Sequence, residues 1–278
     1  MKNKESHLLE KTYDDVKFLL VSNIRMKIML SLYDSPKKSA DLREETFTSS
    51  STVLHAITQL EKRNLVSRRG DLSFLSSKGS LVALKLINLI ETFTILNRHD
   101  IFWKDHCLDG IPKHLKNRFH RLKNAYLIES ILENVEKPFT TYLDMLSNAN
   151  NIKAALPVCF PRHLDNIKLT LNRGGKVDLI LTREIFETLI DHCGYMELKK
   201  YLKKGNLKIF LIARLDIAYV ISEKFMSIGL FFENGEYDST KLLMGQDNEI
   251  LEWGNDLFAY HLQSAQKVNY KSLLKKNN

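Results

Sequence analysis

Residues 51–66, STVLHAITQLEKRNLV, and the segment after them, residues 67–79, SRRGDLSFLSSKG, decide the fold of the first part of this chain. Val53, Ile57 and Leu60 recur at the three-to-four-residue spacing of one helix face. Such a face packs inward, so we predict an amphipathic helix over the first segment. The second segment has short runs on either side of a Gly-Asp pair, which is typical of a tight two-stranded hairpin.

The opposite face of the predicted helix is polar, with Leu54 as an apolar exception. It carries Ser51, His55, Thr58 and Lys62. Hydroxyl and imidazole groups can reach base edges in a DNA major groove, where an apolar side chain can meet a thymine methyl group. We expect the helix to end at Asn64, because asparagine suits the left-handed conformation that closes helices.

Two more helices are predicted before this one. Residues 23–34 have a helical apolar pattern, and Pro36 enforces a break after them. Residues 39–47 have Ser39 as a possible N-cap and acidic residues in the first turns, which suit the positive end of the helix dipole. The hydroxyl-rich residues 48–50 form a short turn whose last residues can cap the next helix.

The hairpin is expected to pair residues 66–69 with residues 72–75 around Gly70. Arg68 and Arg69 lie near its tip, where two adjacent cations can neutralise DNA phosphates. The first 79 residues are therefore predicted to be three helices followed by a hairpin.

Helix, turn and hairpin in this order resemble the winged-helix transcription regulators of the ArsR and MarR type. The residues that carry the resemblance are Thr52, Val53, His55, Ile57, Leu60, Glu61, Asn64, Leu65 and Val66. The resemblance implies sequence-specific binding of double-stranded DNA. The residues implied are Ser50, Ser51, Thr52, Leu54, His55, Thr58 and Lys62 on the helix, and Arg68 and Arg69 for the DNA backbone. A winged helix used only for protein contacts, and an unrelated helical bundle, are the alternatives.

Composition agrees with a polyanionic partner without deciding the question. The 278 residues suffice for two domains, and the formal net charge is +8. Residues 1–80 hold 14 Lys and Arg against 10 Asp and Glu, so they contribute +4 and the rest of the chain contributes the other +4. Three widely spaced cysteines, Cys107, Cys159 and Cys193, fit buried thiols in a reducing compartment. With no signal peptide recognised, we expect a cytoplasmic protein.

Residues 81–96, LVALKLINLIETFTIL, are predicted to form a long linking helix. The segment contains Lys85 and Glu91, and we expect it to be too short and too charged to span a membrane. One apolar row has the spacing of a helix-helix seam. Its members are Val82, Leu86, Leu89, Phe93 and Leu96. Homodimerisation through this seam is favoured, because dimeric winged-helix proteins read two half-sites; burial between two domains of one chain is the alternative.

Beyond residue 97 the pattern changes to alternating strands and helices. Strands are expected at residues 125–130, 151–158, 176–182 and 207–213, and helices near 101–103, 140–147, 162–171, 184–191 and 196–203. Near-continuous apolar strands separated by helices predict an α/β sheet that is covered on both faces. Residues 218–235 and 241–244 suggest a hairpin or meander, and residues 249–268 a closing helix. The predicted organisation is a winged helix at 1–79, a linking helix at 80–97 and an α/β domain at 98–278.

The second part resembles the effector domain of archaeal methanogenesis regulators and, more distantly, the phospholipase-D-like domains of archaeal sugar-responsive regulators. The resemblance rests on the helix with Trp103, the Ile111-Pro112 start, the AALPV strand, residues 172–182 and the run that ends at Asp238. Phospholipase D chemistry needs a His-x-Lys-x4-Asp unit. At that place this chain has Ser222, Lys224 and Gly229, so no catalysis of this type is expected and the domain is not predicted to be an enzyme.

Such a domain can still bind a small molecule, because open α/β sheets place ligands beyond the carboxyl ends of their strands. The candidate lining residues are Pro157, Cys159, Thr182, Arg183, Arg214 and Asp216. No cofactor and no metal site is expected. We therefore predict a homodimeric transcription regulator whose DNA affinity responds to a small molecule. An enzyme acting on a phosphorylated metabolite while tethered to DNA, and a chromatin protein without sequence preference, are the alternatives.

Overall fold

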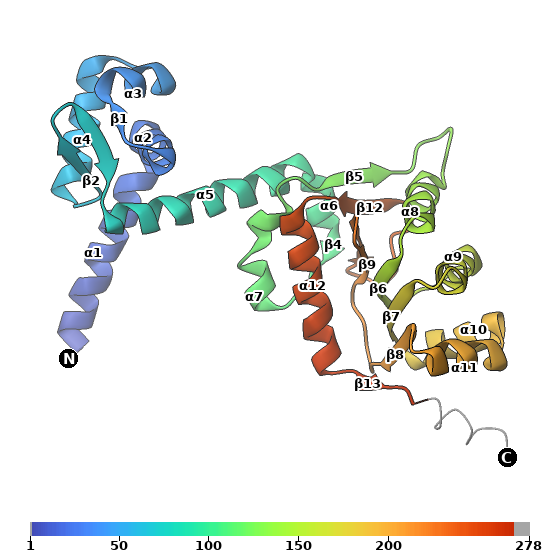
Figure 1. The fold of residues 1–278 in the computed structure, drawn as a ribbon. Coiled ribbons are helices and arrows are strands. Elements are labelled where there is room, and N and C mark those ends of the chain that lie inside the picture. Colours follow the sequence, from blue (N-terminus) through green and yellow to red (C-terminus); the bar gives the residue numbers. More distant parts are fainter. Residues whose placement is uncertain (1, 270–278) are drawn as a thin grey trace. The chain divides into compact units, whose positions relative to one another are not determined.

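The computed structural model describes residues 2–269 and the side chains of residues 5–269. It contains two compact units, Met1–Ile90 and Glu91–Asn278. The boundary falls inside one helix, α5 (Ser77–Arg98), which is labelled in Figure 1. Residues 77–90 of α5 belong to the first unit and residues 91–98 to the second.

The first unit packs helices against a small antiparallel sheet. Its elements before α5 are α1 (Lys2–Leu20), α2 (Asn23–Asp34), β1 (Lys37–Lys38), α3 (Ser39–Thr46), α4 (Ser50–Lys62), β2 (Val66–Arg69) and β3 (Leu72–Leu75). Val53, Ile57 and Leu60 are buried in the core together with residues of α2 and α3, as the apolar spacing predicts. The hairpin of β2 and β3 is confirmed, with Gly70 at a φ of 62° in its turn, and Asn64 follows α4 with a φ of 57°.

Three features of this unit differ from the expectations. A fourth helix, α1, precedes the other three, and β1 adds a third strand beside β3. Ser39 does not cap α3, because Lys38 is the N-cap and its backbone N–H donates to the Asp41 carboxylate at 3.1 Å. The cap predicted for α4 is present, since Ser49 Oγ accepts the N–H of Thr52.

The apolar seam predicted along α5 is not one free stripe. Val82 packs against the core of the first unit, and Leu86 is 7% exposed within that core. Leu96 packs against a core of the second unit. Of the five residues predicted to form the seam, only Leu89 and Phe93 are exposed. The seam is divided because the two units each use one end of the helix for burial.

At 22 residues, α5 is the one helix within the described part of the chain that has the length and apolar composition of a membrane span. The expectation that this segment is too short and too charged to span a membrane is therefore wrong as far as length and composition go. Its buried residues, however, lie in folded cores: Ala83 in that of the first unit and Ile95 in that of the second. Only 22% of its apolar window is buried within the described chain, so these cores cover a minor part of α5, and one helix of this kind is weak evidence for a membrane role.

The second unit is built on an eight-stranded mixed sheet with the order β13-β8-β7-β6-β9-β10-β12-β5. The strands are β5 (Tyr126–Glu129), β6 (Asn151–Leu156), β7 (Lys176–Leu181), β8 (Leu207–Leu211), β9 (Ala218–Ser222), β10 (Met226–Gly229), β12 (Lys241–Gly245) and β13 (Gln266–Lys267). Only β6, β7 and β8 are parallel neighbours; the other pairs are antiparallel. A separate pair joins β4 (His106–Cys107) to β11 (Phe231–Phe232).

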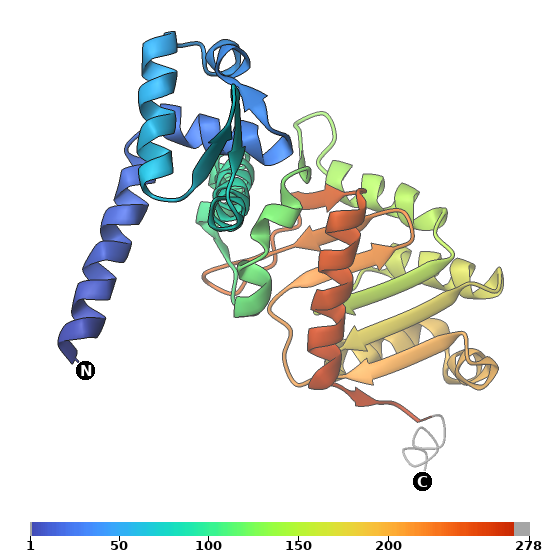
Figure 2. The same ribbon diagram turned by 60° about the vertical axis from the view of Figure 1, so that its left-hand side comes forward.

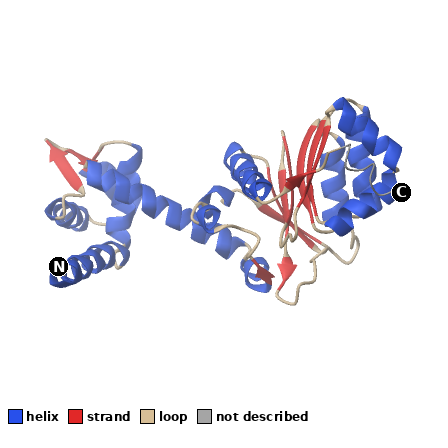
Figure 3. Cartoon of the chain, turned by 90° about the horizontal axis from the view of Figure 1, so that it is seen from below, coloured by secondary structure: helices blue, strands red, loops and turns tan. Residues whose placement is uncertain are grey.

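Helices cover both faces of this sheet, as expected (Figures 2 and 3). One face packs against α8 (Lys137–Ser147), α9 (Pro161–Asn172), α10 (Arg183–Cys193) and α11 (Tyr195–Lys204). The other packs against α12 (Asn248–Gln263), α6 (Asp100–Asp105), α7 (Lys113–Lys116) and the 3-10 helix Phe119–Leu122. The closing helix ends at residue 263 rather than 268, because the residues after it pair with β8 at the sheet edge.

Candidate functional sites

The exposed face of α4 is the first candidate site. Ser50, Ser51, Thr52, Leu54, His55 and Lys62 are exposed on it, and Thr58 is half-buried. Ser49 Oγ lies 2.9 Å from Ser51 Oγ and 2.8 Å from Thr52 Oγ1, so three hydroxyl groups gather at the start of the helix. Thr58 Oγ1 donates to the Leu54 carbonyl at 2.9 Å, which occupies its proton within the helix.

Hydrogen bonds fix the tautomer of the His55 ring. Arg25 Nη1 can only donate, so the atom it meets at 2.7 Å is the Gln59 carbonyl oxygen Oε1. Gln59 Nε2 is therefore the amide nitrogen, and it donates to His55 Nε2 at 2.8 Å. The ring proton is then on Nδ1, which forms no hydrogen bond with any other described residue and is available as a donor. Sequence reasoning missed Gln59 and Arg25, because their contact spans 34 residues.

The cations at this site differ in their partners. Arg68 Nη2 lies 2.5 Å from the Glu61 carboxylate, which raises the pKa of the guanidinium and offsets its charge. Arg69 and Lys62 have no ion pair with any residue that the structure describes. In the turn between α3 and α4, Phe47 is 90% exposed and has a φ of 54°, an uncommon conformation for an aromatic residue. No feature of the sequence pointed to this side chain.

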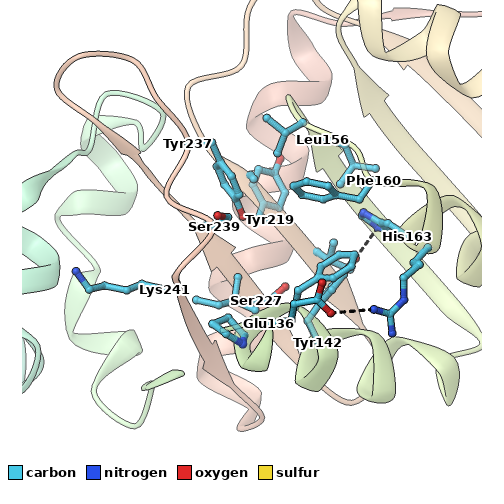
Figure 4. Close-up of a pocket in the computed structure, with 18 of the residues that line it drawn as sticks. Glu136, Tyr142, Leu156, Phe160, His163, Tyr219, Ser227, Tyr237, Ser239 and Lys241 are labelled. Carbon is cyan, nitrogen blue, oxygen red and sulfur yellow. Dashed lines mark hydrogen bonds and ion pairs between the residues drawn. The ribbon is translucent and has the colours of Figure 1, made fainter. Parts of the chain in front are cut away.

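The second candidate site is a cavity of about 470 Å³ in the second unit (Figure 4). It lies past the carboxyl end of β6, where that strand has parallel β7 on one side and antiparallel β9 on the other. Open α/β sheets bind ligands at such a change of strand order. The start of α8, the start of α9 and the facing ends of β10 and β12 complete the walls.

The walls of the cavity are mostly aromatic and aliphatic. They include Pro138, Phe139, Tyr142, Leu156, Val158, Phe160, Pro161, Tyr237 and Leu242. The Tyr142 hydroxyl and His163 Nε2 are 2.5 Å apart, and both side chains are buried. Burial lowers the pKa of His163 to about 4 and raises that of Tyr142. Both groups are therefore neutral near pH 7.

Two hydroxyl groups at the cavity lack a partner. Ser227 is 2% exposed, and no residue from 5 to 269 gives its Oγ a hydrogen bond. The Tyr237 hydroxyl is likewise unpaired among the described side chains, and burial raises its pKa to about 12. Its ring packs so closely on Gly229 that a Cβ there would lie 2.3 Å from the hydroxyl oxygen. The two hydroxyls therefore belong to the lining of the cavity rather than to a network of the protein.

Charged side chains at the cavity are already compensated. Arg162 Nη1 lies 3.3 Å from Glu136 Oε2 at the rim. Lys241 directs its amine away from the cavity in Figure 4, and its Nζ is 4.0 Å from Asp238 Oδ2. The cavity therefore offers no unpaired charge from these three lining residues.

None of the six ligand residues predicted from the sequence lines this cavity. Thr182 caps α10, with its Oγ1 3.5 Å from the Ile185 N–H, and Arg183 is exposed in the first turn. Arg214 Nε and Asp216 Oδ1 form an exposed pair at 2.6 Å. Pro157 is half-buried. Cys159 packs against the sheet core, and burial raises the pKa of its thiol to about 12. At the place of the phospholipase D motif, Ser222 Oγ accepts the N–H groups of Lys224 and Phe225 and holds the β9–β10 turn.

A buried pair links the cavity to α5. Asp238 lies between two lining residues of the segment before β12, and its Oδ2 is 3.0 Å from His106 Nε2. The other ring nitrogen, Nδ1, donates to the Phe102 carbonyl at 2.6 Å. The neighbouring Trp103 donates its Nε1 proton to the Ile95 carbonyl of α5 at 3.0 Å. Sequence reasoning missed this connection, because its central contact joins residues 132 positions apart.

Comparison with known proteins identifies both units. The family described as "Methanogenesis regulatory protein FilR1, N-terminal domain" matches residues 13–94, and "Methanogenesis regulatory protein FilR1, middle domain" matches residues 135–264. The chain belongs to the FilR1 family of regulatory proteins. The FilR1 N-terminal match includes α4 and the wing, and the FilR1 middle-domain match includes every lining residue of the cavity. The sequence resemblance to an archaeal winged-helix regulator with a methanogenesis-regulator effector domain is thereby confirmed.

FilR1 of Methanothrix harundinacea (strain 6Ac) is 26% identical to this chain over 258 residues. The match covers 91% of this chain and 58% of the relative, so the chain spans a little over half of the length of that FilR1 protein.

Two solved structures show distant similarity to this FilR1-family chain. One is TrmBL2, an archaeal chromatin protein, with a TM-score of 0.43 at 14% identity, covering 96% of this chain and 100% of that one. The other is the phospholipase D family member Nuc of Salmonella typhimurium, with a TM-score of 0.38 at 9% identity, covering 52% of this chain and 97% of that one. At these scores the phospholipase-D-like assignment stays a prediction.

Proposed function

We propose that this chain is a transcription regulator that binds double-stranded DNA with the exposed face of α4. The division of α4 into two faces carries the proposal, because its apolar side is buried and its solvent side holds hydroxyls, an imidazole and a cation. The His55 Nδ1–H donor suits the acceptor atoms of guanine in the major groove. Arg69 adds a cation at the wing that can contact a phosphate.

In vitro selection from random duplexes, followed by fluorescence anisotropy, tests this proposal. His55→Ala is expected to weaken binding to the selected sequence by about tenfold or more and binding to random DNA much less, because it removes a base contact. Ser80→Ala, an exposed change on α5, is the control. Equal affinity for selected and random duplexes at two salt concentrations would contradict a sequence-specific regulator and favour the chromatin alternative.

We further propose that the regulator acts as a homodimer, through α1 rather than through the divided α5 seam. Leu9, Tyr13, Val16 and Leu20 are exposed along α1 at spacings of four, three and four residues. Glu10 and Lys17 flank this stripe. In an antiparallel pair, each Glu10 meets the partner's Lys17, whereas a parallel pair gains no such contact.

Cysteine cross-linking distinguishes the two arrangements. A mixture of Leu9→Cys and Leu20→Cys chains is expected to form a mixed disulfide dimer, because antiparallel pairing brings these positions together. Leu9→Cys alone should remain uncross-linked, since its two copies lie far apart in that arrangement. A dimer of Leu9→Cys alone indicates parallel pairing instead. Sedimentation as a monomer both with and without operator DNA would refute the homodimer.

Finally, we propose that a small molecule in the cavity changes the DNA affinity. The chain of contacts from Asp238 through His106 and Phe102 to Trp103 and α5 supports this role, because a change in the cavity walls can reach the helix that both units share. A ligand shifts DNA affinity only if it binds the DNA-competent and incompetent states differently.

A thermal-shift screen of metabolites, followed by DNA titration with each compound that raises the melting temperature, tests the effector role. We expect at least one such compound to change the dissociation constant for DNA. By reciprocity, bound DNA should change the affinity of the protein for that compound by the same factor. Compounds that bind the cavity and leave DNA affinity unchanged would refute regulation by this site.

A further inference from the structure

The two unpaired hydroxyls of the cavity require a partner that the protein does not supply. Ser227 Oγ and the Tyr237 hydroxyl receive no hydrogen bond from any residue the structure describes, and both oxygens are open to the cavity rather than sealed inside the protein. Both line the cavity, and both can donate as well as accept. Their partner is therefore water in the cavity, or the oxygen or nitrogen atom of a ligand that displaces it.

The same cavity provides no counter-charge for an ionic ligand. Glu136 and Arg162 compensate each other at the rim, and Lys241 turns to Asp238 outside the cavity. Burial keeps His163 neutral near pH 7. A carboxylate, phosphate or ammonium group that entered would lose its hydration without gaining a partner of opposite charge.

The remaining walls suit an apolar body. Phe139, Leu156, Phe160 and Leu242 present rings and aliphatic side chains to a volume of about 470 Å³, which is within the range of pockets for small organic ligands. An occupant that fills this space gains from burial of its own apolar surface. Its polar atoms need to match only the hydroxyl groups.

We propose that the cavity binds an uncharged amphipathic molecule: a ring or chain against the apolar walls, and a hydroxyl, carbonyl or ester oxygen bonded to Ser227 and Tyr237. This inference names the ligand class for the proposed effector site, and it excludes the phosphorylated metabolite of the enzyme alternative. It concerns binding alone, so it stands or falls separately from the regulation of DNA affinity.

Probes that share one skeleton test the proposal on the full chain. They are 4-phenyl-1-butanol, 4-phenylbutyrate, 4-phenylbutylamine and 4-phenylbutyl phosphate, titrated near neutral pH by ligand-observed NMR. We expect the alcohol to bind about tenfold or more tightly than any charged probe, because only the charged head groups lose hydration without compensation. Equal or tighter binding of a charged probe, or no binding of the alcohol up to about 5 mM, overturns the proposal.

Variants locate the binding. Ser227→Ala should weaken the alcohol roughly fivefold, the size of one neutral hydrogen bond, and leave butylbenzene, which has no oxygen, unchanged. Ser80→Ala is the matched serine control outside the cavity. Unchanged binding of the alcohol to Ser227→Ala refutes the assigned contact. If the alcohol binds as expected and DNA affinity does not respond, the ligand class stands and the effector role fails.

Discussion

Gly79 in the first turn of α5 gives a sharp test of how the first unit is held together. A Cβ at this position would lie 1.9 Å from the Leu65 carbonyl oxygen and 2.8 Å from the Leu65 carbonyl carbon. That oxygen already accepts the N–H of Ser76 at 3.0 Å. Because the obstacle is backbone rather than the end of a flexible side chain, Gly79→Ala must displace the start of α5 from Leu65, the residue before β2.

Helix propensity and packing predict opposite signs for this substitution. Propensity alone predicts a gain of about 0.5–1 kcal/mol, because alanine loses less chain entropy than glycine in a helix. Overpacking costs about 1–3 kcal/mol, and a contact this short against backbone belongs at the upper end. We therefore expect the free energy of unfolding of the first unit to fall by about 2 kcal/mol.

Hydrogen exchange measured by mass spectrometry is the suitable assay, because both tryptophans, Trp103 and Trp253, lie in the second unit and do not report on the first. A loss of about 2 kcal/mol corresponds to roughly 30-fold faster exchange in α4 and β2, since about 1.4 kcal/mol is a factor of ten. Peptides from α9 should not change. Ser80→Ala, the exposed neighbour, should leave exchange unchanged. Slower exchange in Gly79→Ala would refute the close approach.

Three further predictions follow from the same structure. Burial lowers the folded-state pKa of His163 from 6.5 to about 4. Its contribution of up to about 3 kcal/mol to the free energy of unfolding is therefore complete above pH 6.5 and is lost as the pH falls toward 4. Chemical denaturation followed by tryptophan fluorescence should show this loss in wild type and not in His163→Gln. In a plot of log DNA affinity against log salt concentration, Arg69→Ser should reduce the steepness of the slope by about one. Arg68→Ser should reduce it less, because a carboxylate of α4 already offsets the charge of Arg68. Equal slopes for the two variants would contradict this difference between the two arginines. Asp238→Asn should destabilise the second unit by about 3 kcal/mol or more, because it breaks the buried pair with His106, and an unchanged urea midpoint would count against that contact.

The sequence by itself determined the winged helix. The burial of Val53, Ile57 and Leu60, the left-handed Asn64 and the hairpin turn at Gly70 all follow from spacing and residue type over fewer than 20 positions. Such signals are local, because helix periodicity and turn conformation depend on neighbouring residues. The same locality explains why most strands and helices of the second unit were predicted near their observed positions.

Tertiary structure decided the cavity and the use of α5. Tyr142, Ser227 and Tyr237 line one cavity only because β6, β10 and β12 adopt one particular order in the sheet and bring the segments beside them together. No local pattern encodes which strands become neighbours. The six ligand residues predicted after β6, β7 and β8 therefore do not line this cavity. The sequence correctly predicted a helix with apolar residues at regular spacing along α5. Spacing cannot tell, however, whether a partner chain or the two units of the same chain bury those residues. Burial depends on what packs against a face, and only the folded chain contains that information.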